Sequence, residues 1–414
     1  MEESRKDIKE KKNSKLILKA VFITALILGA FVLGNLSIRL GLVIGSNCDD
    51  YAYAINMAQK YPEFTTLFEV RNDIEKLYDG EIDDKALAEN ATKSMTETLG
   101  DPYTVYMNSE EFEKYMESNS GSFIGIGVYI TVVDDKVTVS GLVEGGSAEK
   151  SGIKAGDIIQ KVDGEDIGND INKAVSLITG KEEKTLSITI ERAEEGTFVV
   201  NVKRAKVETI SVDGEMVSND IGYIRLKNFN KNSSSQFSKK LDELTNSGMK
   251  GLVLDLRGNG GGYLDEAIKI ASEFIPNGEI VTYTIDKYDN KIVHKSIGNS
   301  VHDIPITILI DGNSASASEV LTGALRDYGI AKTVGVTSFG KGIVQEIFPL
   351  NSGDGGLKVT VSKYYSPNGI NIHGTGIIPD YNVEIPEEVL NSQYSKEIDT
   401  QYQKAIEVMN ELIK

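Results

Sequence analysis

The amino-acid sequence predicts a multidomain α/β protein with a helical N-terminal region, an inserted β-rich module and one N-terminal transmembrane helix. Three observations lead to this prediction. Short apolar runs alternate with helix-like segments from 207 to 385, which is the pattern of an α/β domain. Short alternating strands bounded by glycines fill 119–206. A charge-free stretch of 19 residues, Ala20 to Ile38, follows a cluster of lysines.

Length and composition limit the function classes. The 414 residues suffice for two or three domains. Lys and Arg number 44 against 62 Asp and Glu, so the formal net charge is −18, and nucleic acid is not an expected partner. The three His lack paired ligand spacing, and the single Cys forms neither an internal disulfide nor a Cys-rich metal site. We therefore expect no metal and no cofactor.

The N-terminus predicts a membrane anchor. Residues 1–19 are rich in lysine and form a predicted cytoplasmic tail, and 20–44 form a signal-anchor helix long enough for a bilayer core of about 30 Å. The flanking cations predict a cytoplasmic N-terminus, with the remaining chain outside the cell membrane. A cleaved signal peptide is the alternative, although Gly45-Ser46 is only a weak cleavage site. Asn47 disfavours a lipid on Cys48.

Residues 49–118 are predicted to be helical, and LGDPYTVYM (Leu99–Met107) interrupts the helices with Gly and Pro. The region 386–414 is predicted to end in a helix over Lys396–Ile413. Neither region suggests chemistry of its own. We therefore predict that 50–118 and the last helix mediate formation of a homodimer.

The module at 119–206 resembles a PDZ domain. The resemblance rests on FIGIGV (Phe123–Val128), on Gly146–Gly164 and on the helix Ile171–Ile178. It implies that the backbone of one glycine-containing loop binds a peptide carboxylate, and that the peptide adds as a strand beside it. That loop would be Ile124, Gly125, Ile126 and Gly127. The alternative is that these glycines only form turns.

The half from 207 to 385 alternates strands with helices. The predicted strands are 221–229, 251–257, 305–312, 331–336, 342–350 and 357–365. The predicted helices are 233–248, 263–275 and 316–329. Loops at the carboxyl ends of such strands are the usual place for a site.

Two of these loops carry chemistry. Ser316 follows a buried strand at the first turn of a helix, where the N–H of Ala317 adds to the positive end of the helix dipole. GNGGG (258–262) permits close backbone approach, and N–H groups from the two loops would form an oxyanion hole. Ser316 needs a base. Lys341 is flanked by the apolar Phe339, Ile343 and Val344, and desolvation by such neighbours can keep a lysine neutral.

Five motifs together resemble one protein family. They are LGDPYTVYM, DLRGNGGG, SASASEVLTGALRDYG, TSFGKGIVQ and KYYSPNG…GTGIIPD, and they span about 95–382. The chain is similar to the carboxyl-terminal processing (tail-specific) proteases, which are S41-type serine peptidases with an embedded PDZ domain. The resemblance implies a ClpP/crotonase-like α/β protease core.

The resemblance also assigns residues. It implies Ser316 as nucleophile, Lys341 as base and Gln345 as the residue that orients the lysine. The oxyanion hole carries over to the amides of Gly261, or Gly260, and Ala317, and Asp327 is implied to be structural. Many relatives have an arginine where this chain has Ile370, which leaves the substrate preference open.

Three competing interpretations remain. SASAS alone is typical of helix capping, so Ser314, Ser316 and Ser318 could all be caps. Gly335–Lys341 is a near miss to a phosphate-binding loop, but Gly342 stands where Ser or Thr should bind magnesium. The third is a catalytically inert, membrane-tethered PDZ scaffold. The favoured expectation is a membrane-anchored serine endopeptidase that cleaves extracytoplasmic proteins recognised by their C-terminal tails.

Overall fold

The computed structural model describes residues 56–57, 59–298, 302–390 and 395–414. The chain divides into two units, Met1–Leu87 and Ala88–Lys414. The predicted cytoplasmic tail and the signal-anchor segment 20–44 lie outside the described residues. Within the part of the chain that the structure describes, no helix is both long and apolar enough to cross a membrane.

The N-terminal region is mainly helical, as predicted. It comprises η1 (Pro62–Phe64), α3 (Thr65–Leu77), α4 (Asp84–Glu97), β1 (Val105–Met107) and α5 (Ser109–Asn119). The strand β1 was not predicted, and it forms where Gly100 and Pro102 end the preceding helix. A capping box starts α5, because the Asn108 side chain accepts from the Glu111 N–H while the Glu111 carboxylate accepts from the Asn108 N–H.

The module at 119–206 is a compact β-rich body with its own core. Its entry strand β2 (Ser122–Gly125) pairs antiparallel with its exit strand β9 (Ala205–Glu208). Between them lies a sheet of order β3-β4-β5-β7-β8 in which β6 pairs with β5. Its strands are β3 (Val128–Val133), β4 (Lys136–Leu142), β5 (Ile158–Val162), β6 (Glu165–Asp166), β7 (Thr185–Arg192) and β8 (Gly196–Lys203). The helices are α6 (Ser147–Lys150) and α7 (Ile171–Ile178).

The largest domain is built on a six-stranded sheet of order β10-β11-β12-β15-β16-β19. Its strands are β10 (Val212–Met216), β11 (Ile221–Leu226), β12 (Gly251–Asp255), β15 (Ile306–Ile310), β16 (Ala331–Gly335) and β19 (Tyr381–Asn382). All neighbours are parallel except β10, which pairs antiparallel with β11. Every residue of β12 and β15 is buried, as expected for central strands covered on both faces.

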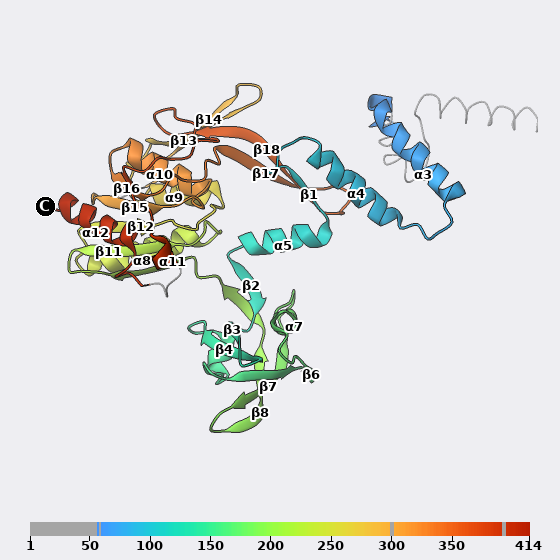
Figure 1. Cartoon of the computed structure of the whole chain (residues 1–414), viewed down its shortest axis with the longest axis horizontal. Coiled ribbons are helices and arrows are strands. Elements are labelled where there is room, and N and C mark those ends of the chain that lie inside the picture. Colours follow the sequence, from blue (N-terminus) through green and yellow to red (C-terminus); the bar gives the residue numbers. More distant parts are fainter. Residues whose placement is uncertain (1–55, 58, 299–301, 391–394) are drawn as a thin grey trace, which may run out of the picture. The chain divides into compact units, whose positions relative to one another are not determined.

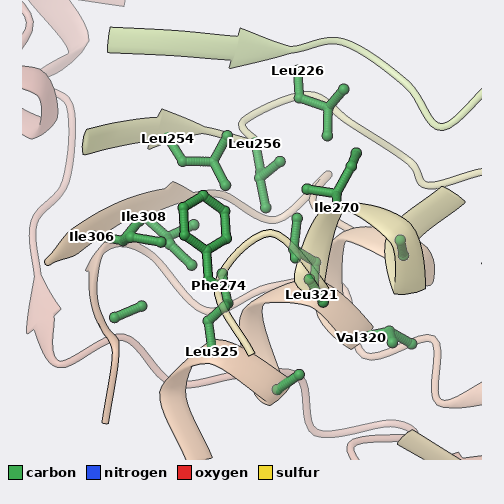
Figure 2. Close-up of a cluster of buried hydrophobic side chains, with 14 of the residues drawn as sticks. Leu226, Leu254, Leu256, Ile270, Phe274, Ile306, Ile308, Val320, Leu321 and Leu325 are labelled. Atoms are coloured by element: carbon green, nitrogen blue, oxygen red, sulfur yellow. The ribbon is translucent and has the colours of Figure 1, made fainter. Parts of the chain in front are cut away.

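Helices cover both faces of this sheet (Figure 1). The helices α8 (Ser233–Asn246), α9 (Leu264–Ala271) and α10 (Ala317–Asp327) contribute to one core, into which Leu252 and Leu254 point from β12. Within that core Phe274 lies among side chains from the strands and from α10 (Figure 2). The alternate residue Val253 packs on the other side, against α12 (Thr400–Leu412). The predicted α/β alternation is therefore confirmed.

The last helix has a role that differs from the predicted one. Its apolar side chains at Tyr402, Ala405, Val408 and Met409 are buried against the sheet of their own domain. These side chains are therefore not available for dimer contacts, which contradicts the predicted role of Ala405 and Val408, whereas Leu412 is 39% exposed and a dimer contact there stays a prediction. The pattern of apolar residues on one helix face is the same whether the face packs within the chain or against a partner.

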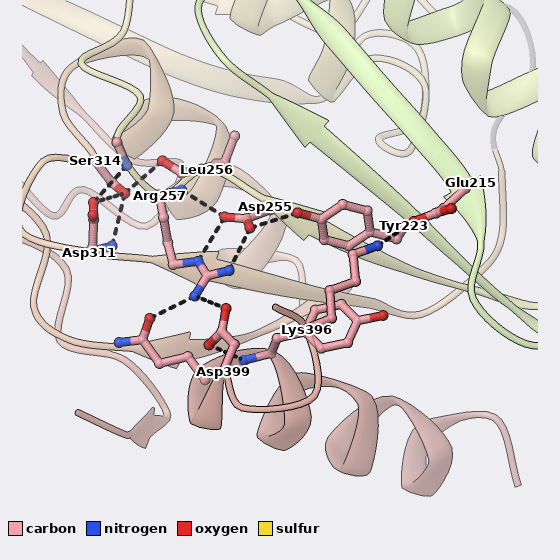
Figure 3. Close-up of polar contacts among 12 residues, drawn as sticks. Glu215, Tyr223, Asp255, Leu256, Arg257, Asp311, Ser314, Lys396 and Asp399 are labelled. Carbon is pink, nitrogen blue, oxygen red and sulfur yellow. Dashed lines mark hydrogen bonds and ion pairs between the residues drawn. The ribbon is translucent and has the colours of Figure 1, made fainter. Parts of the chain in front are cut away.

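A polar cluster attaches α12 to the end of β12 (Figure 3). The guanidinium of Arg257 donates to Asp255 at 2.7 and 3.0 Å and pairs with Asp399 at 2.8 Å. The hydroxyl of Tyr223 donates to Asp255 at 2.9 Å. Asp255 and Asp399 are both 1% exposed, so the arginine compensates two buried carboxylates. This cluster holds the strand end from which the loop GNGGG emerges.

A second sheet, of order β1-β18-β13-β14 with β17 beside β18, is entirely antiparallel. It contains β13 (Ile280–Asp286), β14 (Lys291–Lys295), β17 (Ile343–Pro349) and β18 (Gly356–Tyr365). The strands β13 and β14 were not predicted. A short helix, α11 (Glu387–Leu390), follows β19. This sheet matters for the site because β17 follows Lys341 directly and β18 joins it to β1.

Candidate active site

Ser316 occupies a strained turn between β15 and α10. Its backbone has φ 56° and ψ −115°, which is unusual for a residue other than glycine and costs on the order of 1–3 kcal/mol. The Ser316 N–H donates to the carboxylate of Glu319 at 2.8 Å. Its carbonyl accepts from the N–H of Val320 at 2.9 Å and from the hydroxyl of Tyr364 at 3.3 Å. The surroundings hold this conformation from both sides of the residue.

The two neighbouring serines fasten this turn to the glycine loop. The Ser314 hydroxyl donates to the carbonyl of Leu256 at 2.9 Å, and the Ser318 hydroxyl donates to the carbonyl of Asn259 at 2.8 Å. Ser314 and Ser318 are fully buried. Their side chains bridge two strand-to-loop turns, so the capping interpretation does not describe them.

The glycine loop lies directly against the Ser316 turn. Gly261 has φ +99°, and a Cβ at this position would lie 2.7 Å from the Ala315 carbonyl oxygen and 2.9 Å from the Ala317 nitrogen. Only glycine fits such an approach. The Gly261 N–H donates to Asn259 Oδ1 at 2.9 Å. In this conformation the Gly261 amide is therefore engaged within its own loop, which leaves the amides of Gly260 and Ala317 as the candidates for an oxyanion hole.

Lys341 lies on the loop before β17 and is held by an amide. Its Nζ donates to Gln345 Oε1 at 2.8 Å, and Gln345 Nε2 in turn donates to the carbonyl of Tyr103. The same Nζ lies 4.6 Å from the centre of the Tyr103 ring. Tyr103 belongs to the motif LGDPYTVYM, for which no chemistry was predicted. The motif supports the lysine from a segment more than two hundred residues earlier in the chain.

The surroundings of Lys341 favour its neutral form. Burial is the main cause that lowers the pKa of Lys341, and the positive charge of Lys358 lowers it further, against weaker opposing effects of Asp101 and Glu319. Among the residues that the structure describes, Lys341 has no ion-pair partner. Ile343 and Val344 line the same cavity as the lysine, as predicted. Phe339 is 53% exposed and is not among the residues that line this cavity, so its predicted part in desolvating Lys341 stays a prediction.

Glu319 joins the serine turn to the lysine loop, and sequence reasoning missed it. Its side chain is 2% exposed. One carboxylate oxygen accepts from the N–H groups of Ser316 and Lys341 at 2.8 and 2.9 Å. The other accepts from the Ser338 hydroxyl at 2.6 Å and the Gly340 N–H at 2.7 Å. An acidic residue in the first turn of an otherwise apolar helix was the available signal.

Glu319 also decides against the phosphate-loop alternative. The N–H groups of Gly340 and Lys341, which would have to bind a phosphate, already donate to this carboxylate. The segment after Lys341 is the strand β17, whereas a phosphate loop opens a helix.

A cavity of about 290 Å³ brings these groups together. Its wall includes Ser316, Lys341 and Gln345, the loop Gly260–Gly262, and Ala317. The structure thus places all three predicted residues of the catalytic centre on one cavity. Further wall residues, which were not predicted, are Tyr115, Tyr263, Lys358 and Tyr364. Burial raises the pKa of Tyr364 well above its ordinary value, so its hydroxyl stays protonated beside the Ser316 carbonyl.

Two further predicted positions lie outside this cavity. The Asp327 carboxylate accepts from the N–H of Asn368 at 2.8 Å and so supports the loop after β18, which fits its implied structural role. Ile370 is 56% exposed.

The predicted peptide-binding loop of the PDZ module lies at the junction of β2 and β3. Ile124 and Gly125 belong to β2, where they pair with Lys206 and Ala205. Ile126 is fully buried in the module's core, and Gly127 has φ +79° before β3 begins. Its assignment to carboxylate binding stays a prediction.

Models of known families match three parts of the chain. The model described as peptidase family S41 matches 220–383, and a PDZ domain model matches 138–192. A model described as the N-terminal domain of the activating protease CtpB matches 51–111.

Individual relatives extend over more of the chain. The carboxy-terminal processing protease CtpA of Bacillus subtilis is 33% identical over 371 residues, which are 89% of this chain and 77% of the relative. A carboxy-terminal-processing protease of Bartonella bacilliformis is 37% identical over 312 residues, which are 73% of this chain and 71% of the relative. Among solved structures, the photosystem II D1 C-terminal processing protease is 29% identical with a TM-score of 0.47, and the match covers 79% of this chain and 91% of that one.

Proposed function

Because the chain belongs to peptidase family S41, as a serine-type carboxy-terminal processing protease, we propose that Ser316 is its nucleophile and Lys341 its general base. The observation that carries this proposal is the hydrogen bond from Lys341 Nζ to the neutral amide of Gln345 on the wall of the cavity that also contains Ser316. A carboxylate in place of the amide would hold the lysine protonated. A neutral amide oxygen accepts a hydrogen bond from one N–H of Lys341 without adding a negative charge. The lone pair of the neutral amine is then free to accept the proton of Ser316.

These groups support the following proposed steps. Ser316 Oγ attacks the scissile carbonyl carbon while its proton passes to Lys341 Nζ. The amides of Gly260 and Ala317 stabilise the oxyanion. The carbon–nitrogen bond then breaks, and the leaving amine takes the proton back from Nζ. Water attacks the resulting ester while its proton passes to Lys341 Nζ; the ester carbon–oxygen bond then breaks, Ser316 Oγ takes that proton back, and the acid product leaves. Gln345 keeps Lys341 Nζ in place, and the Tyr103 carbonyl keeps Gln345 in place.

We infer that the PDZ domain binds the C-terminal tail of a protein substrate and delivers it to this cavity. A PDZ domain adds an extended peptide to a strand edge and binds its terminal carboxylate with backbone amides. We further propose that the segment 20–44 anchors the chain in the cell membrane, with the protease on the extracytoplasmic side; the charge pattern of 1–44 supports this orientation.

A homodimer formed by the N-terminal helices also remains our proposal. The helix α3 buries no side chain, and Phe68 and Leu77 are 71% and 82% exposed. An apolar helix surface of this kind is typical of an interface. Light scattering should give the mass of two chains for the full-length protein. The variant with Phe68 and Leu77 both replaced by Glu should have the mass of one chain.

The alternative of an inert PDZ scaffold makes opposite predictions. A disordered model protein with a free C-terminal tail should be hydrolysed by the wild-type chain and only bound by Ser316→Ala. Removing the tail should slow hydrolysis. A scaffold would bind the tailed protein equally in both variants and release no fragment, which mass spectrometry of the reaction mixture detects.

A further inference from the structure

The cavity that contains Ser316 has a one-sided charge. Its wall includes two lysines, Lys341 and Lys358, and no Asp, Glu, Arg or His. When Lys341 is neutral, as its proposed role requires, Lys358 is the remaining cation on the wall. This is notable in a chain whose formal net charge is −18.

Lys358 is placed by the strands on both of its sides. It lies in β18, opposite Val105 of β1 and Ile347 of β17. Its side chain is half-buried, and Nζ lies 5.1 Å from the centre of the Tyr115 ring, which also faces the cavity. The neighbouring strands and the aromatic ring thus place Lys358 on the wall of the cavity.

Among the residues that the structure describes, no carboxylate forms an ion pair with this ammonium group. Within the described part of the chain, Lys358 takes part in no ion pair and no side-chain hydrogen bond. Asp101 is the acidic group whose charge acts on it. The Asp101 carboxylate is itself engaged by the N–H of Tyr103 at 3.0 Å and by the Thr104 hydroxyl at 2.6 Å. A half-buried ammonium group without a protein acceptor is only partly solvated, and a ligand carboxylate in the cavity would supply the missing acceptor.

We propose that Lys358 binds a carboxylate of the peptide substrate in the cavity beside Ser316. The carboxylate comes from an acidic side chain near the scissile bond or from the C-terminus of the peptide. Both present the same charge and geometry to an ammonium group, which binds as a point charge rather than through a planar fork. This inference rests on the proposed peptidase function, since it names a substrate feature of the same cavity.

The test measures binding, so that it does not depend on cleavage. Amidated ten-residue peptides of Ala, Ser and Val carry a single Glu at successive positions, and a matched set carries Gln. A third set carries Gln and a free C-terminal carboxylate. Calorimetry measures their dissociation constants for the full-length chain bearing Ser316→Ala. At one position we expect Glu to bind about tenfold more tightly than Gln, or the free carboxylate to bind about tenfold more tightly than the amide.

Substitution of Lys358 shows whether the preference for a carboxylate comes from this residue. Added to Ser316→Ala, Lys358→Met should abolish the charge preference while leaving the affinity for the amidated Gln peptides within about threefold. Lys358→Arg should retain it. A preference for a free C-terminus that comes from the PDZ domain persists in Lys358→Met, so only the part that this variant removes belongs to Lys358. Lys358→Met with both preferences unchanged would overturn the inference, and so would their loss in Lys358→Arg.

The proposed function is tested separately. If the wild-type chain fails to hydrolyse disordered proteins while the Lys358-dependent preference is present, the carboxylate site stands and the peptidase assignment fails. If hydrolysis depends on Ser316 but no Lys358-dependent preference exists, the peptidase assignment stands and the carboxylate site fails.

Discussion

One carboxylate oxygen of Glu319 accepts hydrogen bonds from the backbone N–H of Ser316 and the backbone N–H of Lys341. The proposed nucleophile and base are thus connected through one buried side chain that belongs to neither of their motifs. Glu319 thus bridges the two loops at the residue that has the strained φ of 56°. We expect Glu319 to be a positioning residue.

Glu319→Gln tests that expectation. The amide keeps the size but offers a single acceptor oxygen to four donors, so at least one buried N–H or hydroxyl is left without an acceptor. We expect kcat to fall about a hundredfold with little change in KM, and the free energy of unfolding to fall by about 2 kcal/mol. Steady-state kinetics and urea unfolding measure the two effects.

Glu266→Gln is the matched control, because Glu266 is also 2% exposed but its carboxylate accepts from Ser234 and Lys269 rather than from the two loops. It should lose stability and keep kcat. Equal losses of kcat in both variants would show that Glu319 acts only through stability.

Gln345→Glu tests the protonation state of the proposed base. In the wild type the lowered pKa of Lys341 means that the neutral amine is formed as the pH rises through that pKa, so kcat/KM rises along the low-pH limb of the profile. A carboxylate at position 345 would contact Nζ, stabilise the ammonium form and raise the pKa of Lys341. The limb should therefore move to higher pH, by about one pH unit or more, and activity near neutral pH should fall at least about tenfold.

Glu346→Gln is the control for this shift, because Glu346 lies next on β17 with an exposed side chain. Its profile should stay within a few tenths of a pH unit of the wild type. If the low-pH limb of Gln345→Glu stayed at the wild-type position, Lys341 would not be the group that causes this limb.

Gly261→Ala and Gly260→Ala form a second pair. At Gly261 the new methyl group would lie 2.9 Å from the Ala317 nitrogen on a backbone with φ +99°, whereas at Gly260 nothing lies within 4 Å of it. We expect Gly261→Ala to lower kcat/KM more than a hundredfold and Gly260→Ala to remain within about threefold of the wild type, because alanine keeps the amide N–H at position 260. Equal kinetics of the two variants would contradict the close approach of the loops.

Most strands and helices of the α/β domain could be predicted because local patterns specify them, and the same patterns pointed to Ser316 and Lys341, whereas Gln345 came only from the family resemblance. Apolar runs mark the buried strands β12 and β15, and glycines mark the loops after them. The contacts that complete the site come from residues distant in sequence. The Tyr103 ring lies beside Lys341 because β1, the strand that follows Tyr103, pairs with β18. This pairing is not visible in the sequence around either residue.

Other misses have equally specific causes. Glu319 was not singled out, because acidic residues commonly occupy a first helical turn. The engagement of the Gly261 amide by Asn259 depends on a side-chain rotamer that no sequence pattern encodes. The apolar face of α12 could not be assigned to a fold or an interface by periodicity, and only the buried sheet opposite it decides.

The central claim is that Ser316 and Lys341 act as one chemical unit. It is tested most directly by the turnover of a tailed, disordered protein by Ser316→Ala, Lys341→Ala and the double variant, with tail binding measured in each. We predict that each single variant binds the tail normally and loses at least about a thousandfold in kcat, and that the double variant loses no more than either. Lys341→Ala with kcat within about tenfold of the wild type would contradict the claim.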